Sequence, residues 1–258
     1  MKKTTIKRIA LLLVIAALLY MSMLVCNVSL GALSKGIVDG IAFLGEMFPP
    51  DFSALPDMIY PAVETIMISF LATFFGALLS FFFALAGASN ISPMWLKSIS
   101  RFFMATERAL PEIIIILLLV AALGLGPFPG VIALAIGCIG MLGRLFSDAI
   151  EEVNAKTIES VQSAGATKIQ VIQYVIIPEI LPSLISNTLF RFEVNTRLSV
   201  LLGAVGAGGI GYEIFYSFQL LEYERATTAI LVVLLLVFMS ERVSDYFRKK
   251  ILSNTKLK

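Results

Sequence analysis

The chain has 258 residues, of which 58% are hydrophobic and 15% are charged, and its mean hydropathy is +0.91. A single water-soluble core cannot bury that much apolar surface, so the composition excludes a soluble globular domain and predicts a multi-pass membrane protein. The net charge of +2 is small and gives no reason to expect nucleic-acid binding.

Six apolar stretches are long enough, at about 20 residues each, to cross a bilayer as helices. They cover residues 9–27, 60–86, 107–125, 129–147, 181–204 and 226–244. The first follows a cluster of lysines and an arginine, as a signal peptide would, but no clear small-residue cleavage site comes after it. We therefore expect an uncleaved anchor helix. An even number of spans places both chain ends on one side of the membrane.

The lysines and arginines indicate which side that is. With the N-terminus in the cytoplasm, fifteen of the twenty cations lie in inner segments and only Lys35 and Arg225 in outer ones. The other three, Arg108, Arg191 and Arg197, fall within or at the edge of spans. This asymmetry predicts that both termini are cytoplasmic.

Three segments are expected along the chain. Residues 1–58 contain the anchor helix and an external or interfacial segment, residues 59–248 form the transmembrane domain, and residues 249–258 form a basic cytoplasmic tail. Within 28–59, apolar residues at helical spacing suit a helix lying along the outer interface, and a partly ordered external loop is the alternative. No glycine-rich loop followed by Lys-Ser or Lys-Thr is present, so the chain has no nucleotide site of that kind.

The two cysteines, Cys26 and Cys138, lie in different apolar spans, and the chain has no histidine. We expect neither a disulfide nor a soft-metal site.

A polar island at residues 151–182 interrupts the apolar pattern. It contains the small-residue run Ser163-Ala164-Gly165-Ala166 between two helix-forming stretches. A helix–glycine–helix elbow makes a compact knob that a soluble protein can bind, although an ordinary loop with a helical hairpin would look similar. Pro178 and Pro182 are expected to end the second helix and to start the next span.

The fifth span carries charges that must face protein or water. Asn187, Arg191 and Asn195 are four residues apart and share one helix face, which suits a water-lined path for an anion. Glu193 and Arg197 have the same spacing and can pair with each other. For both arginines a role in the path and a structural role are open.

Two further segments have unusual residues. The run from Gly203 to Gly211 follows a span and has no βαβ pattern around it, so it is not a dinucleotide loop; its glycines favour a sharp helix break at the external end. Arg108, Pro111 and Glu112 open the third span with another possible ion pair, for which we favour a structural clamp.

These segments together resemble the permease subunits of phosphonate and phosphite ABC importers. The coupling loop of ABC importer permeases reads Glu-Ala-Ala, three residues, Gly, then an apolar-Pro step, and Glu159-Ser160-Val161, Gly165 and Ile177-Pro178 follow this spacing with two alanines replaced. The other matching segments are Arg108–Glu112, Gly124–Val131, Glu151-Glu152, Phe190–Arg197 and Gly203–Gly211. The resemblance covers roughly residues 60–248.

The resemblance implies an all-α membrane protein with the MetI-like type I importer permease fold, which has five core helices and a peripheral N-terminal helix. It implies a homodimer in the bacterial cytoplasmic membrane, with two ABC ATPase subunits on the cytoplasmic side and an extracytoplasmic substrate-binding protein. ATP and Mg would bind to the ATPase, and this chain would have no cofactor of its own. It would catalyse no bond chemistry and would move its substrate by alternating access.

The residue patterns and the resemblance together give expected roles to three groups of residues. Within a cytoplasmic coupling loop at 148–180, the residues expected to contact the ATPase are Glu159, Ser163, Ala164, Gly165, Ala166 and Pro178. The residues expected along the substrate pathway are Asn187, Arg191, Glu193, Asn195 and Arg197. The residues expected at the external gate and helix break are Gly203, Gly206, Gly208, Gly209 and Gly211.

Two other functions fit parts of the sequence. The first is an ABC importer permease for methionine or another small solute, against which the arginines within spans argue because methionine is a zwitterion. The second is a membrane enzyme that acts on phospholipid head groups. Such enzymes use clustered acids to hold metal or a histidine nucleophile, and this chain has no histidine and no Asp-rich cluster.

Overall fold

The computed structural model describes residues 2–255, and no β-strand occurs in that range. The predicted all-α fold is confirmed. The chain divides into two units, Met1–Pro49 and Pro50–Lys258.

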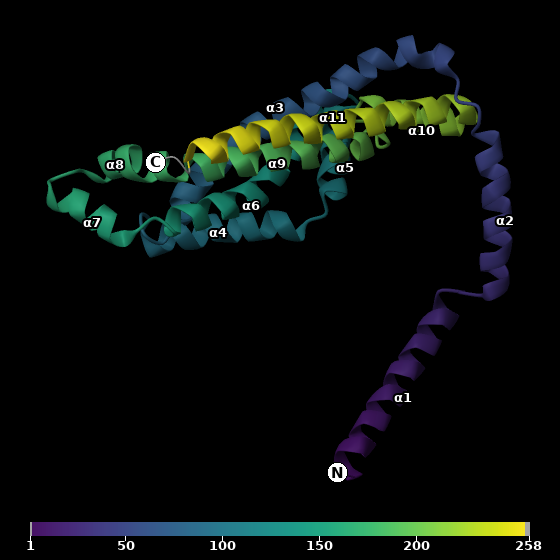
Figure 1. The fold of residues 1–258 in the computed structure, drawn as a ribbon, viewed down its shortest axis with the longest axis horizontal. Helices are drawn as coiled ribbons and strands as arrows, with labels where there is room; N and C mark the ends of the chain where they lie inside the picture. Colours follow the sequence, from purple (N-terminus) through teal and green to yellow (C-terminus); the bar gives the residue numbers. More distant parts are fainter. Residues whose placement is uncertain (1, 256–258) are drawn as a thin grey trace. The chain divides into compact units, whose positions relative to one another are not determined.

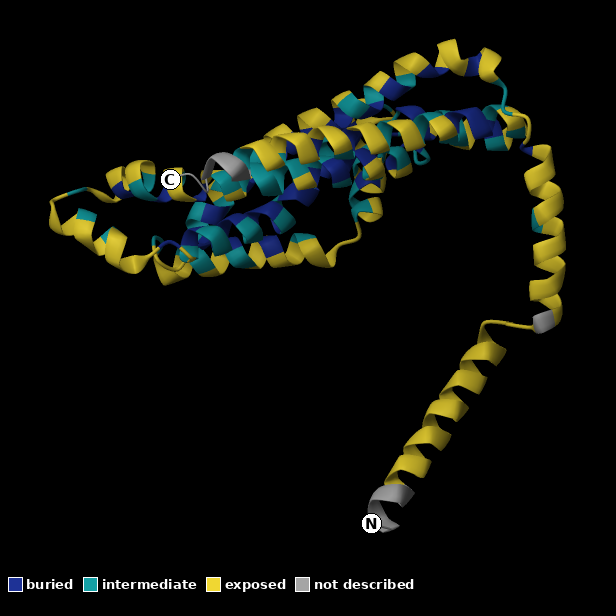
Figure 2. Ribbon diagram, viewed as in Figure 1, coloured by how far each residue is buried: buried dark blue, intermediate teal, exposed yellow. Residues whose placement is uncertain are grey.

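The first unit contains two helices, α1 (Lys2–Val25) and α2 (Leu30–Glu46). Ser29 caps α2, because its hydroxyl accepts a hydrogen bond from the backbone N–H of Ala32 at 3.0 Å. A helix therefore forms within the segment 28–59, where the sequence left a loop as the alternative. The described side chains of α1 are exposed along its whole length (Figure 2), as expected for an apolar helix that meets lipid.

The second unit is a bundle of nine helices within the described residues. Their bounds are α3 Leu55–Gly87, α4 Met94–Ala109, α5 Glu112–Leu123, α6 Pro127–Glu151, α7 Ala155–Ser163, α8 Lys168–Val171, α9 Ile177–Gly203, α10 Ile210–Gln219 and α11 Tyr223–Thr255. Helices α3, α6, α9 and α11 pack alongside one another, and α7 and α8 project beyond one end of the bundle (Figure 1).

Five helical segments in the described range are long and apolar enough to cross a membrane, and they match five of the six predicted spans. The exception is the span predicted at 107–125, which is two helices. The amphipathic helix α4 ends at Ala109, and α5 follows with only 12 residues. Pro111 causes the break, because a proline disfavours helical backbone at the residue before it, and Leu110 is extended with ψ of 125°.

Helices α3 and α6 form the centre of the bundle, where small residues bring the two backbones together. A Cβ added to Gly76 of α3 would lie 2.5 Å from the Cβ of Cys138 on α6. Ser80 of α3 donates to the carbonyl oxygen of Cys138 at 3.0 Å. The buried residues in Figure 2 gather on these inner faces, so close helix packing, rather than large apolar side chains alone, makes the core.

Residues 50–58, which the sequence analysis grouped with the N-terminal segment, are held to the start of α11. The backbone N–H of Asp51 donates to the carbonyl of Glu224 at 3.2 Å, and the hydroxyl of Thr228 donates to the carbonyl of Asp51 at 2.9 Å. Met58 is fully buried in a cluster with Ile210. The approach to α3 is therefore part of the bundle.

Candidate functional site

Helices α7 and α8 form the predicted knob, with Gly165 in the turn between them. Gly165 has φ of +90°, and an added Cβ would meet no atom within 4 Å. The turn requires glycine for its backbone conformation and leaves the space around it open. Glu159, Ser163 and Ala164 are exposed beside it, while Ala166 is half-buried against the bundle. The knob therefore presents a compact surface with no bulky side chain at its tip.

Local caps and inward packing hold these short helices in place. The side chain of Asn154 accepts from the N–H of Lys156 at 2.9 Å at the start of α7. At the start of α8, Thr167 and Gln170 form a capping box. Ile158 of α7 packs inward on the apolar cluster of the bundle. The knob is thus anchored on one side and free on the other.

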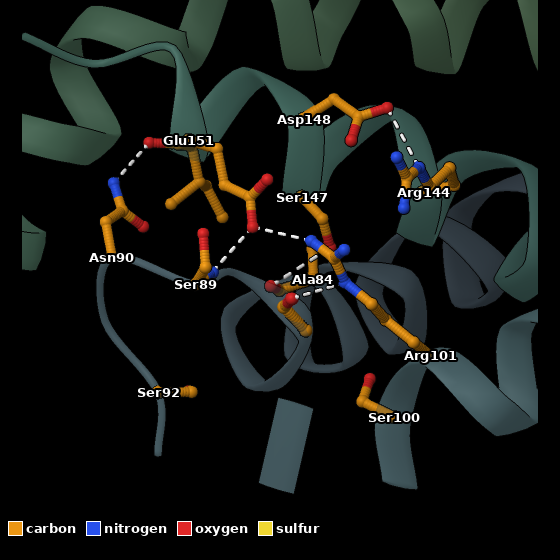
Figure 3. A network of polar contacts seen from close by, with 12 residues as sticks. Ala84, Ser89, Asn90, Ser92, Ser100, Arg101, Arg144, Ser147, Asp148 and Glu151 are labelled. Atoms are coloured by element: carbon orange, nitrogen blue, oxygen red, sulfur yellow. Dashed lines mark hydrogen bonds and ion pairs between the residues drawn. The ribbon is translucent and has the colours of Figure 1, made fainter. Parts of the chain in front are cut away.

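A polar network ties the foot of the knob to the bundle where α6 ends (Figure 3). One carboxylate oxygen of Glu151 accepts from the Arg101 guanidinium and from the backbone N–H of Ser89, both at 2.6 Å. The amide of Asn90 donates to the carbonyl of Ile150 at 2.8 Å. The last turn of α6 is therefore bonded to α4 and to the connection between α3 and α4.

The chain runs from α8 into α9 through a π-helical turn, Ile172–Ile176. The expectation that Pro178 ends one helix and Pro182 starts the next is wrong. Pro178 lies in the first turn of α9, and Pro182 lies inside it. Proline fits the first turn of a helix because the N–H groups of that turn have no partner within the helix. The π-helical turn just before α9 has a different hydrogen-bond spacing from an α-helix. The knob is therefore linked to α9 by continuous helix.

Arg191 lies at the middle of α9 and is buried, with 5% of its side chain exposed. Its Nη2 is 2.9 Å from Oε1 of Glu112, the first residue of α5. Gly137 of α6 makes room for the pair, since an added Cβ would lie 2.7 Å from Nη2 and 2.9 Å from Oε1. The ion pair expected near Pro111 is thus made with Arg191 and not with Arg108. Burial and pairing favour the structural role that the sequence left open for Arg191.

Asn195 and Asn187 have different surroundings, although both were expected on the Arg191 face. The Nδ2 of Asn195 donates to the hydroxyl of Thr73 at 2.9 Å and to the sulfur of Cys138 at 3.4 Å, and the residue is fully buried. The Nδ2 of Asn187 donates to Ser183 on the same helix at 3.3 Å. Asn195 therefore joins α9 to α3 and α6, while Asn187 makes no such link.

Glu193 forms its shorter ion pair with a residue that the sequence did not indicate. Its Oε1 is 2.8 Å from Nη2 of Arg248, near the end of α11. The expected pair with Arg197 is at 4.0 Å, and Arg197 lies closer to Glu241 at 3.1 Å. The α9–α11 packing decides this arrangement, which helical spacing within α9 cannot reveal.

The glycine-rich run breaks the helix between α9 and α10, as predicted. Gly206, Gly208 and Gly209 all have positive φ, and a Cβ added to Gly203 would lie 2.7 Å from the backbone of the same loop. The N–H of Gly126, in the turn between α5 and α6, donates to the carbonyl of Gly206 at 2.8 Å. Two reverse turns thus meet, and Gly206 leaves the room that the side chain of Leu125 from the other turn occupies.

Two side chains of α3 fix this loop, and the sequence analysis missed both. The carboxylate of Glu64 accepts from the N–H of Gly209 at 2.6 Å, and the hydroxyl of Thr65 accepts from the N–H of Ile210 at 2.9 Å. They cap the start of α10, whose own N-cap residue is a glycine. An isolated acid within the second apolar span was the signal that could have identified Glu64.

Comparison with known proteins gives a consistent result. Residues 76–253 match the family described as binding-protein-dependent transport system inner membrane components. HtxC of Stutzerimonas stutzeri, described as a phosphite transport system permease, is 35% identical over 240 residues, which are 93% of this chain and 85% of that protein. PtxC of the same organism, also a phosphite transport system permease, is 34% identical over 218 residues, 84% of this chain and 79% of that one.

Among solved structures, the inward-facing MetNI methionine ABC transporter superposes with a TM-score of 0.68. The match covers 78% of this chain and 99% of that chain at 20% identity. At this identity the likeness establishes the fold alone.

The Arg191–Glu112 pair generates a prediction about stability. Arg191→Gln leaves the Glu112 carboxylate without its cation, and we expect the free energy of unfolding to fall by about 2 kcal/mol. Adding Glu112→Gln removes the uncompensated charge and should restore at least half of the loss. Thermal unfolding of the detergent-solubilised protein measures both effects. Arg144→Gln, which breaks an exposed pair with Asp148, is the control and should change little; equal stability of Arg191→Gln and the control would contradict the clamp.

Proposed function

Since the chain belongs to the family of binding-protein-dependent transport system inner membrane components, we propose that it is the permease of an ATP-driven importer for phosphite, phosphonate or a related phosphorus oxyanion. The observation that supports this choice of substrate is the likeness to PtxC and HtxC over most of both chains. The chain is a transport subunit and not an enzyme. A methionine cargo has less support, because the D-methionine transport permease of Vibrio cholerae is 34% identical over only 116 residues, 45% of this chain. The likeness to the methionine transporter structure is at 20% identity and concerns the fold.

The working importer contains more than this chain. We propose that two copies pair around a central path, that two ATPase subunits bind ATP and Mg below them, and that an external binding protein delivers the substrate. The family description supports the binding protein. The exposed knob supports an ATPase contact, because it is anchored on its inner side and open at its tip.

The proposed orientation places α7 and α8, and both termini, in the cytoplasm of a bacterial cell. The distribution of lysine and arginine supports it, since the basic residues Lys156 and Lys168 lie in the knob and Lys249 and Lys250 near the chain end. The turn between α10 and α11 is then extracytoplasmic.

The contacts within the bundle suggest how ATPase movement reaches the path. In this mechanism the ATPase binds the surface formed by Glu159, Ser163, Ala164 and Gly165. A shift of the knob then moves the last turn of α6 through the Glu151–Arg101 network. The same shift moves α9 through the π-helical turn and Pro178. Polar residues of α9 then line or support the path, and the loop from Gly203 to Gly211 forms the external gate.

Substrate uptake tests the function directly. Proteoliposomes that contain this chain with its ATPase and binding protein should accumulate phosphite or methylphosphonate when ATP is present, and should not accumulate methionine. Omission of ATP is the control. Accumulation of methionine without phosphite would establish the alternative cargo instead.

The knob generates a second prediction. Gly165→Leu should abolish uptake, because a large side chain at the tip prevents docking of the ATPase. Gly165→Ala is the matched control: both variants pay a backbone cost of about 1–2 kcal/mol for positive φ, but alanine adds only a methyl group. Uptake should therefore survive in the alanine variant, at normal amounts of protein in the membrane. Equal uptake by the two variants would exclude the tip as the contact.

Orientation is tested by labelling. In a chain with Cys26→Ser, new cysteines at Ser163 and Glu222, both exposed, should react with an impermeant thiol reagent from opposite sides of the membrane. In intact cells Glu222→Cys should react and Ser163→Cys should not. Reaction of Ser163→Cys in intact cells would reverse the proposed topology.

A further inference from the structure

Three arginines fall within or at the edge of the predicted spans, and they differ in whether a carboxylate pairs with the guanidinium. Arg191 is paired with Glu112, and Arg197 is paired with Glu241. Arg108 is exposed, and within the described residues its guanidinium has no hydrogen bond or ion pair. Of these three cations it is therefore the one whose charge is not already matched by a carboxylate of the same chain.

The depth of Arg108 follows from its contact with α6. The Cγ of Arg108 lies 2.7 Å from the position of an added Cβ on Gly140. Gly140 is near the middle of the α6 span Pro127–Glu151, about 16–20 Å from either end at a rise of 1.5 Å per residue. Arginines close to a helix end can reach the head groups, but that distance exceeds the length of the side chain.

An unpaired guanidinium at this depth is unfavourable in hydrocarbon, because no water solvates its charge there. It must therefore face a water-lined path or an acid of another chain. The neighbouring acid forms no ion pair with it within the described residues: Glu107 is half-buried, with its carboxylate against Gly140 of α6, whereas Arg108 is exposed. The acid is turned inward and the cation outward.

The break between α4 and α5 adds to the positive potential at this place. Leu110 and Pro111 are exposed and separate the two helices. No side chain caps the start of α5 at Pro111, and the carboxylate of Glu112 in its first turn is paired with Arg191. The first-turn N–H groups therefore contribute a partial positive charge beside Arg108. Broken helices at mid-membrane recur at transporter binding sites for the same reason.

We propose that Arg108 is the cation of the translocation path that contacts the phosphoryl-type oxygens of the substrate. This inference rests on the proposed function. The guanidinium presents a planar fork that matches two oxygens of a phosphorus oxyanion, which a lysine ammonium cannot do. Arg191, held by Glu112, positions α5 and α9 around the path instead of contacting the substrate.

The test uses the complete importer in proteoliposomes, with phosphite as the probe. Arg108→Gln should reduce uptake at least tenfold at normal protein amount, while ATP hydrolysis stimulated by the loaded binding protein stays within twofold of wild type. Arg108→Lys keeps the charge and should lie between the two. Arg144→Gln removes a cation from the surface of α6 and should leave uptake within twofold. A structural role for Arg108 would instead lower the protein amount or ATP hydrolysis together with uptake.

Accessibility gives a second measurement that does not depend on transport. In a chain with Cys26→Ser and Cys138 buried, Arg108→Cys should react with a water-soluble thiol reagent in the assembled importer, and phosphite with the binding protein should slow the reaction at least threefold. An unreactive cysteine, normal uptake by Arg108→Gln, or loss of the dimer in that variant would each overturn the proposal. If the wild-type importer takes up no phosphorus oxyanion, the proposed function is refuted. The reactivity of Arg108→Cys still tests separately whether residue 108 faces a water-lined path.

Discussion

Helix α6 has a glycine at each of several places where another element approaches it, and the rest of the bundle depends on this. Gly130 lies against Ala207 of the glycine-rich loop, Gly137 against the Arg191–Glu112 pair, and Gly143 against Met104 of α4. In lipid there is no hydrophobic force between helices, so association relies on close packing and on internal hydrogen bonds. Missing side chains on α6 supply the room for both.

The same constraint governs the charges. A carboxylate or guanidinium removed from water is stabilised only when a partner lies within hydrogen-bonding distance. Glu112 and Glu193 are each paired with an arginine from a different helix, at 2.9 Å and 2.8 Å. These pairs join α5 to α9 and α9 to α11, so each contact that neutralises a charge also fixes the relative positions of two helices.

The knob is connected through continuous helices to the charged cluster of Arg191, Glu112 and Arg108. Glu151 binds both Arg101 and Ser89 at the end of α6, and α6 continues from there to Gly140 and Gly137. On the other side, helical backbone continues from Lys168 to Gly203 without a break. A protein that moves the knob therefore acts on the two helices that flank the charged cluster.

The sequence by itself determined the membrane class, five of the spans, the glycine elbow at Gly165 and the helix break at the glycine-rich run. These features are local: apolar length and backbone φ are properties of a short stretch of chain. Sequence also found Arg191, Glu193 and Asn195, because charged and amide residues are rare in spans.

Only the tertiary structure decided the partners of these residues. Helical spacing suggested Arg197 for Glu193, but Arg248 from α11 makes the shorter pair. Glu64 caps a helix that begins 146 residues later at Ile210. The sequence suggested a clamp that contains Arg108 and Glu112, but Arg191 from α9 makes the pair with Glu112. Such pairings depend on which helices pack side by side. The sequence shows which residues of a helix are charged, but it does not show which residues of other helices neutralise them.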